Sequence, residues 1–166
     1  DRFGVRIHEL YGMTEVGGWV TGNGITARRR GTCGLPRADL EITVVDSHDQ
    51  HVAPGVTGEI VVRPKEPDVM FSGYFGDAAA AWAAAGNFWF HTGDVGSFDP
   101  DGFLSFHGRF KEIIRRGGEN ISPVEIETIL LQHPLIEDAA VVGMPDPIFG
   151  EEVKAVVQLE PGEALT

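Results

Sequence analysis

The stretch from residue 108 to 127, GRFKEIIRRGGENISPVEIE, constrains the fold more than any other part of the chain. Residues 113 and 114 are isoleucines among charged residues and predict a short, half-buried strand. Gly117 and Gly118 predict a bend, because their backbone carries no Cβ atoms. Residues 122 to 125 (Ser-Pro-Val-Glu) have the order of a helix start, with Ser as N-cap, Pro at the first helical position and Glu at the third. The stretch therefore predicts a strand, a glycine turn and a capped helix in close succession.

Four other segments have the patterns of strands. Residues 40 to 45 and 58 to 63 are rich in β-branched residues and are separated by a turn-rich segment, so they predict two strands of a mainly antiparallel sheet. Residues 95 to 98 and 103 to 107 flank the sequence Asp-Pro-Asp-Gly, which is typical of a tight turn. They predict a hairpin.

Weaker patterns occur near the beginning and in the middle of the chain. Residues 5 to 10 are short and apolar and predict a strand. Residues 19 to 37 are rich in Gly, Thr and Arg, have no clear period and predict a loop. Asp77 is expected to cap an alanine-rich helix over residues 78 to 85, with Trp82 as its anchor in the core.

The last part of the chain mixes one helix with strands. Residues 123 to 132 carry apolar side chains at helical spacing and end at His-Pro, and strand-like runs follow at 136 to 142 and 153 to 159. This order predicts a small α+β lobe. Because the sequence stops soon after the last run and does not begin with Met, we expect it to be a fragment of a longer protein.

Composition excludes several classes of protein. The formal net charge of −12 argues against a nucleic-acid surface, which needs a positive footprint. No run approaches the roughly 20 apolar residues that a membrane span requires. The single cysteine, Cys33, cannot form an internal disulfide and fits a reducing compartment, so we expect a cytoplasmic protein.

Three motifs in a fixed order resemble one known family. They are YGMTE at residues 11 to 15, HTGD at 91 to 94 and the stretch at 108 to 127, and they are similar to the adenylate-forming acyl-CoA synthetases and ligases, the AMP-binding enzymes. The wording GNFWFHTGDVG with RRGGENIS is similar to the carnitine and crotonobetaine CoA-ligase branch. The resemblance implies an α+β fold in three parts: the C-terminal, mainly antiparallel β-rich part of the large AMP-binding domain (1–108), a hinge (109–111) and the beginning of the small C-terminal α+β domain (112–166).

The resemblance also implies ATP, Mg²⁺ and coenzyme A as cofactors and a small carboxylic acid as substrate. By analogy with the family, Tyr11 packs against adenine, and Gly12 and Met13 belong to the same nucleotide-binding motif. The Thr14 hydroxyl would meet the phosphates, and Glu15 would help to hold Mg²⁺. A hydroxyl and a carboxylate suit this hard, oxygen-preferring ion.

Five further residues receive roles from the same resemblance. Asp94 would accept hydrogen bonds from the ribose hydroxyls, and Arg109 would donate to ribose or phosphate. Lys111 occupies the hinge position, where the backbone turns between two orientations of the C-terminal lobe. Gly117 and Gly118 would lie along the pantetheine channel of coenzyme A, since a backbone without Cβ atoms admits a close approach.

The expected function is therefore a fragment of an ATP-dependent acyl-CoA ligase, which activates a carboxylic acid as an acyl-adenylate and transfers the acyl group to CoA. The alternatives are an adenylation domain that loads a carrier protein and a noncatalytic interaction module. A phosphate loop before Asp1 and a catalytic lysine after Thr166 are expected, so the fragment alone should be inactive. The sequence leaves the carboxylic acid and the oligomeric state open.

Overall fold

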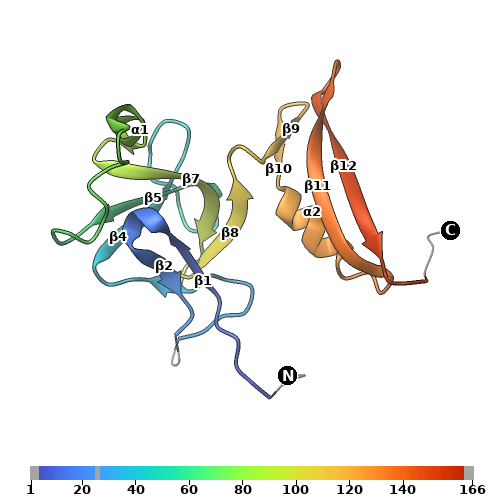
Figure 1. Cartoon of the computed structure of the whole chain (residues 1–166), viewed down its shortest axis with the longest axis horizontal. Helices are drawn as coiled ribbons and strands as arrows, with labels where there is room; N and C mark the ends of the chain where they lie inside the picture. Colours follow the sequence, from blue (N-terminus) through green and yellow to red (C-terminus); the bar gives the residue numbers. More distant parts are fainter. Residues whose placement is uncertain (1–3, 25–26, 163–166) are drawn as a thin grey trace. The chain divides into compact units, whose positions relative to one another are not determined.

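The computed structural model describes residues 4–24 and 27–162 of the chain. The chain forms two compact units, Asp1–Phe106 and His107–Thr166, and each is described by itself (Figure 1). Antiparallel strands dominate the sheets of both units, and each unit carries one short α-helix. The predicted α+β fold class is confirmed.

The first unit begins with a hairpin. Strand β1 (Leu10–Met13) leads into the 3₁₀ turn η1 (Thr14–Val16), and β2 (Gly18–Gly22) returns antiparallel to β1. The short strand β3 (Leu35–Pro36) pairs with the end of β2. The hairpin places the YGMTE motif at the end of one strand and on the turn that follows it.

The larger sheet of this unit is built from the predicted strands. Its order is β4 (Leu40–Val45), β5 (Gly58–Pro64), β7 (Trp89–Phe98) and β6 (Ala85–Gly86), and β8 (Leu104–Arg109) also pairs with β7. The predicted strands over 40 to 45 and 58 to 63 and the predicted hairpin are confirmed. β7 is longer than predicted and includes the HTGD motif.

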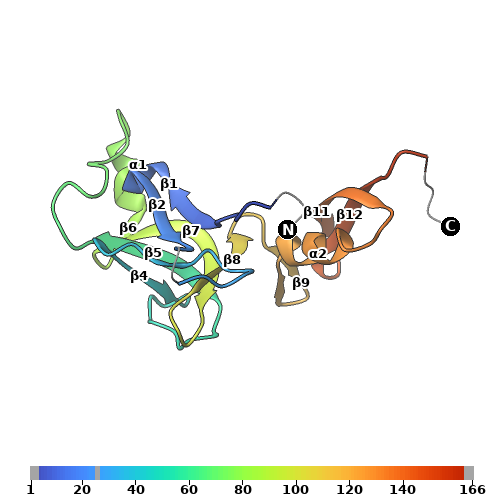
Figure 2. The same ribbon diagram turned by 90° about the horizontal axis from the view of Figure 1, so that it is seen from below.

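The core of the first unit lies between the hairpin and the larger sheet. Figure 2 shows β1 and β2 lying over the face formed by β4, β5 and β7. Full burial of one aliphatic side chain stabilises a fold by about 1.5–3 kcal/mol, so this layer is the main source of the unit's stability. The buried side chains that form it are Tyr11, Val16, Val20, Leu40, Val44, Ile60, Val62 and Leu104.

The helix α1 (Ala78–Ala83) begins where the sequence predicts and ends two residues early. Asp77 Oδ1 accepts a hydrogen bond from the backbone N–H of Ala80 at 2.9 Å, which confirms the N-cap. Trp82 is 79% exposed, so the prediction that it anchors the helix in the core is wrong. A six-residue helix makes fewer than two turns, and none of the residues of α1 is buried.

Two other predictions for this unit are wrong. Residues 5 to 9 form no strand, because they pair with no strand among residues 4–24 and 27–162; the strand begins at Leu10. Residues 19 to 37 are not a single loop, since they include most of β2 and all of β3. Pairing with β1 and the burial of Val20 and Thr21 override the weak local pattern.

The second unit is a four-stranded antiparallel sheet with one helix. The elements are β9 (Ile114–Arg116), β10 (Glu119–Ile121), α2 (Pro123–Leu130), β11 (Ile136–Asp146) and β12 (Gly150–Leu159), and the sheet order is β10-β9-β12-β11. α2 packs against β11 (Figure 1). The predicted lobe of one helix with strands is confirmed, and β10 is a strand that the sequence did not predict.

The start of α2 agrees closely with its sequence signature. Ser122 is the N-cap and accepts a hydrogen bond from the backbone N–H of Glu125, and Pro123 is the first helical residue. Gly117 and Gly118 form the β9–β10 turn with φ of +59° and +90°, values that side chains with a Cβ rarely adopt. The predicted strand, glycine turn and capped helix are confirmed. Neither helix in the described part of the chain is long and apolar enough to cross a membrane.

The close approach of β4 and β5 gives a first prediction. A Cβ atom at Gly58 would lie 2.2 Å from the carbonyl oxygen of Val45, and this backbone atom cannot move without disrupting the sheet. We expect Gly58→Ala to lower the free energy of unfolding by about 1–3 kcal/mol, the usual cost of overpacking, in a thermal or urea titration of this chain. Gly22→Ala is the matched control, because its Cβ would stay at least 3.5 Å from its neighbours. Equal stability of the two variants would contradict the prediction.

Candidate functional site

Two of the predicted site residues meet in the first unit although 83 positions separate them. The Tyr11 hydroxyl, on β1, donates a hydrogen bond to Asp94 Oδ2, on β7, at 2.7 Å. Both residues are buried, with 7% of Tyr11 and 3% of Asp94 exposed. The Tyr11 ring stacks on Phe106 with a centroid distance of 5.8 Å and an angle of 26°. The YGMTE and HTGD motifs therefore meet at one buried point.

The HTGD motif holds Asp94 through its neighbours. Gly93 has φ of +71°, and its backbone N–H donates to Glu59 Oε1 at 3.0 Å. The backbone N–H of Asp94 donates to Thr92 Oγ1 at 3.0 Å. His91 Nδ1 lies 2.9 Å from the other carboxylate oxygen of Glu59. Each residue of the HTGD motif thus makes a contact that fixes Asp94 or its strand. The contact of His91 with Glu59 joins β7 to β5.

Thr14 and Glu15 lie on the 3₁₀ turn just beyond β1. Gly17 closes this turn in the left-handed conformation, with its N–H bonded to the carbonyl of Thr14 at 2.9 Å. The carboxylate of Glu15 accepts a hydrogen bond from the Tyr74 hydroxyl at 2.8 Å. This bond is the main cause of a raised pKa of Tyr74, so the phenol remains protonated at neutral pH. The turn directly follows β1, the strand that carries Tyr11, and presents the Thr14 hydroxyl and the oriented Glu15 carboxylate.

Gly12 and Met13 have mainly structural surroundings in β1. A Cβ atom at Gly12 would lie 2.5 Å from the carbonyl oxygen of Gly18 and 2.9 Å from Cα of Trp19, so only glycine fits there. The Met13 side chain packs against the core cluster. These contacts explain the two residue types by packing alone, and a role in nucleotide binding stays a prediction.

Arg109 and Lys111 lie in the second unit, at the end of β8 and on the turn that follows it. The carbonyl of Arg109 accepts hydrogen bonds from the backbone N–H groups of Glu112 and Ile113, at 2.9 and 3.1 Å. Lys111 is exposed on this turn. Before it, Gly108 has φ of +121° and is buried against α2, where its Cβ would meet Val124 at 3.6 Å. The end of β8, a tight turn and the positive φ of Gly108 therefore lie within a few residues of one another.

The glycine turn is fastened to the connection between β11 and β12. The backbone N–H of Gly117 donates to the carbonyl of Phe149 at 2.9 Å. The Arg116 guanidinium lies 4.4 Å above the Phe149 ring and forms an ion pair with Glu152 at 2.8 Å, which raises the pKa of Arg116 and lowers that of Glu152. Gly117 is therefore held by a hydrogen bond to the β11–β12 connection, whereas Gly118 has open space around it.

Sequence reasoning missed three residues that support the site. Phe106 stacks on Tyr11, and its position in the apolar alternation of β8 could have indicated an inward side chain. Glu59 belongs to a predicted strand but bonds to a motif 34 residues away, and Tyr74 lies in a loop without periodicity. No local signal could have found these two. The described residues contain no group of three or more His, Cys, Asp and Glu side chains that could hold a metal on its own.

The fold and the paired motifs are those of the AMP-binding, adenylate-forming enzymes. Residues 1–75 match the family described as AMP-binding enzyme, and residues 125–166 match the family described as AMP-binding enzyme C-terminal domain. The chain belongs to this family and represents its C-terminal portion.

Several known proteins are similar to the chain. It is 40% identical to the crotonobetaine/carnitine–CoA ligase of Proteus mirabilis over 168 residues and 37% identical to the oxalate–CoA ligase of Saccharomyces cerevisiae over 166 residues. These alignments cover 100% and 99% of the chain but 32% and 30% of the two relatives. The structure of ATP-bound MatB from Rhodopseudomonas palustris matches with a TM-score of 0.90 and 31% identity, over 98% of this chain and 32% of that one. The chain thus spans about a third of the length of its relatives.

The Tyr11–Asp94 bond gives a second prediction. Tyr11→Phe keeps the stacked ring and removes one donor from a buried carboxylate, so we expect a loss of roughly 1.5–3 kcal/mol in the free energy of unfolding. Tyr74→Phe is the matched control: it also removes one hydroxyl donor from a carboxylate, but at an exposed site where the loss should be ~0–1 kcal/mol. Urea denaturation of both variants measures the difference. A Tyr11→Phe variant as stable as the control would show that the bond contributes nothing.

Proposed function

We propose that the protein carrying this chain is an ATP-dependent acyl-CoA ligase. A carboxylate oxygen attacks the α-phosphorus of ATP, which gives acyl-AMP and pyrophosphate; the CoA thiol then attacks the acyl carbon, which gives the thioester, AMP and a proton. The observation that carries the proposal is the Tyr11–Asp94 pair, which joins the two motifs at one buried point. A cytoplasmic location, expected from the single cysteine, is part of the same proposal.

Four side chains would hold the nucleotide. Tyr11, with Gly12 and Met13 beside it in β1, would offer its ring to adenine, and Asp94 would accept hydrogen bonds from the ribose hydroxyls. A carboxylate suits a diol because both hydroxyls can donate to it, and such charge-assisted bonds are strong. Thr14 would donate its hydroxyl to the phosphates, and Arg109 would donate to ribose or phosphate. The fixed backbone around Asp94 supports this role, because binding groups on rigid strands keep their geometry.

Glu15 fits the requirements of a Mg²⁺ ligand. Tyr74 occupies one carboxylate oxygen, and the other has no partner among the residues that the structure describes. Mg²⁺ prefers oxygen ligands and is usually held by one or two carboxylates together with substrate phosphates and water, so one protein carboxylate suffices. When bound, the ion would neutralise charge on the phosphates during adenylation. Glu15 would hold the ion, and Thr14 would orient the same phosphates.

Residues 109–111 would form the hinge between the C-terminal part of the large domain (1–108) and the beginning of the small domain (112–166). The division into compact units at residues 106 and 107, close to this boundary, supports the proposal. Lys111 would be the hinge residue, and the open turn at Gly117 and Gly118 would admit the pantetheine arm of CoA. These roles belong to the complete enzyme.

The complete protein provides the direct test. We expect ATP–pyrophosphate exchange that depends on an added carboxylic acid, followed by formation of an acyl-CoA that mass spectrometry detects. A panel of acids that includes oxalate, crotonobetaine and carnitine would search for the substrate, since relatives are named for them. Transfer to a carrier protein instead of CoA would overturn the choice of acceptor. Absence of exchange with a broad panel of acids would overturn the proposed activity.

A third prediction concerns Asp94. In the complete enzyme, Asp94→Ala removes the acceptor for the ribose hydroxyls, so binding should lose about 1.5–3 kcal/mol, or roughly 10- to 150-fold in the ATP dissociation constant. Isothermal titration calorimetry measures the change. Deoxyadenosine triphosphates that lack one ribose hydroxyl should bind wild type more weakly than ATP but bind the variant almost as well as ATP. An unchanged ATP dissociation constant would refute the role.

A fourth prediction concerns the hinge. Proline at position 111 fixes φ near −65° and removes the amide donor, so Lys111→Pro should hold the small domain in one orientation. We expect one half-reaction to fall by at least about tenfold more than the other, because adenylation and thioester formation need different orientations. Pyrophosphate exchange measures the first, and transfer from isolated acyl-AMP to CoA measures the second.

Lys111→Ala is the control for this prediction, because it removes the charge but leaves the backbone free to rotate. It should affect the two half-reactions similarly. If Lys111→Pro lowered both by the same factor, or neither, the hinge would have to lie elsewhere.

A further inference from the structure

Glu15 is held by the loop between β5 and α1 through two separate contacts. The backbone N–H of Phe71 donates to the carbonyl of Glu15 at 2.8 Å, and the Tyr74 hydroxyl donates to Glu15 Oε1 at 2.8 Å. Residues more than 50 positions away thus fix both the main chain and the side chain of Glu15. Glu15 is half-buried, and both contacts restrict its movement.

The Tyr74 side chain is itself fixed. Its ring packs edge-on against Phe71 with centroids 4.9 Å apart, and Phe71 packs edge-on against Phe90 of β7 at 5.5 Å. The carbonyl of Tyr74 accepts a hydrogen bond from Asp77, the N-cap of α1. A chain of aromatic contacts therefore connects the phenol to the central strand of the sheet.

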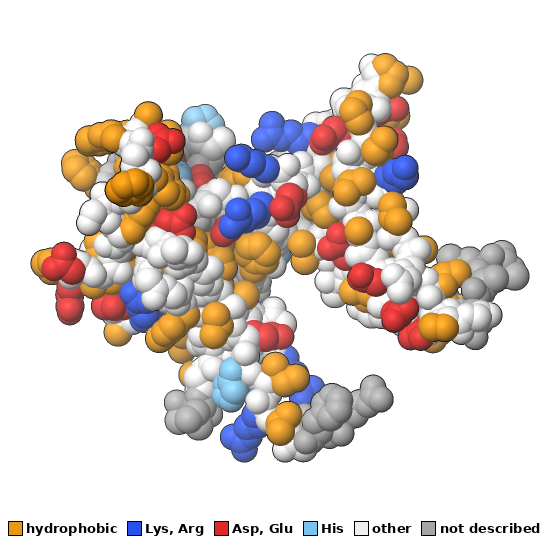
Figure 3. All heavy atoms as spheres, viewed as in Figure 1, with side chains coloured by type: hydrophobic (Ala, Val, Ile, Leu, Met, Phe, Trp, Pro, Cys, Tyr) orange, Lys and Arg blue, Asp and Glu red, His pale blue; other side chains and the backbone are white. Residues whose placement is uncertain are grey.

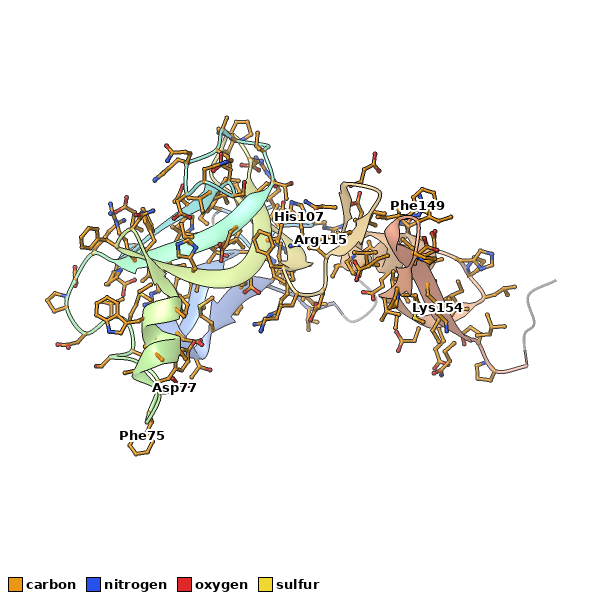
Figure 4. The ribbon with its side chains drawn as sticks, turned by 90° about the horizontal axis from the view of Figure 1, so that it is seen from above. Phe75, Asp77, His107, Arg115, Phe149 and Lys154 are labelled. Atoms are coloured by element: carbon orange, nitrogen blue, oxygen red, sulfur yellow. The ribbon has the colours of Figure 1, made fainter. Side chains whose placement is uncertain are left out.

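The neighbouring Phe75 differs from Tyr74 in its exposure. Phe75 is fully exposed and points away from α1 at the tip of the loop, whereas Tyr74 is 39% exposed (Figure 4). Exposed apolar side chains gather around α1 in the space-filling view (Figure 3). The Tyr74 hydroxyl, in contrast, is engaged by the Glu15 carboxylate.

We propose that Tyr74 is a positioning residue that orients the Glu15 carboxylate toward the metal ion of the bound nucleotide. The inference rests on the proposed function, in which Glu15 holds Mg²⁺. The terminal torsion of a Glu side chain is broad, so a free carboxylate would sample many directions. A hydrogen bond to Oε1 restricts this torsion and aims Oε2, and outer partners of metal ligands act in this way in many proteins.

The test uses the complete protein and Tyr74→Phe, which keeps the ring and its aromatic contacts. Calorimetric titrations with ATP at a series of Mg²⁺ concentrations give the concentration that produces half of the metal-dependent gain in affinity. We expect this concentration to rise about tenfold, the lower end of the effect of losing an outer partner of a metal ligand. Affinity for ATP in EDTA should not change. A merely structural role for Tyr74 would alter both affinities together or neither.

Asn87→Gly is the matched control. It removes a comparable exposed bond, from Asn87 Nδ2 to Asp49 at 2.6 Å, and glycine tolerates the φ of +48° found there. The Mg²⁺ requirement of this variant should equal that of wild type. An equal rise in Asn87→Gly and Tyr74→Phe would overturn the inference, because the effect would then not be specific to Glu15.

Glu15→Gln separates the inference from the proposed function. If Glu15→Gln raises the Mg²⁺ requirement and Tyr74→Phe adds nothing to it in the double variant, the two residues act as one unit and the inference is supported. If Glu15→Gln raises the requirement and Tyr74→Phe alone does not, Tyr74 has no positioning role although the metal assignment stands. If Glu15→Gln leaves the requirement unchanged, the metal assignment and the inference both fail.

Discussion

The hydrogen bond between Tyr11 and Asp94 is the buried polar constraint that joins the two sheets of the first unit. A carboxylate that is 3% exposed is costly to bury, and it is tolerated only where donors surround it. The Tyr11 hydroxyl supplies one donor from β1, and the HTGD backbone fixes the strand that carries the acid. Because β1 and β7 belong to different sheets, the bond also ties the hairpin to the larger sheet. The two residues to which we assign nucleotide binding thus also join the two sheets of the unit.

The proposed site has two parts that are held in different ways. Tyr11 and Asp94 each lie on a strand that is paired within its own sheet. Thr14 and Glu15 instead lie on a single 3₁₀ turn. The hydrogen bond from Tyr74 to Glu15 fixes a side chain of this turn through a different loop and not through strand pairing.

The sequence predicted the features whose causes are local. The caps at Asp77 and Ser122 were predictable because a side chain bonds to a backbone only three residues away. The burial of Trp82 and the loop over residues 19 to 37 were predicted wrongly, because packing and strand pairing over long distances decide them. Tyr11 and Asp94 were placed in one site by family resemblance, and no spacing in the sequence indicates that they touch. Tyr74 carried no signal, since its partner lies 59 residues away.

The hinge proposal has a structural consequence inside the second unit. The Ser122 hydroxyl donates to the carbonyl of His107, and the buried Gly108 packs toward Val124. Both contacts join the end of β8 to α2, so they connect chain on one side of residues 109–111 with chain on the other. The proposed rotation at Lys111 would separate these partners, and one hydrogen bond of this kind contributes about 0.5–1.5 kcal/mol. Under the hinge proposal, one of the two orientations would keep this bond and the other would lose it. Under the same proposal the Ser122 hydroxyl would have two separable roles, since its cap on α2 would persist through the rotation whereas its bond to His107 would not.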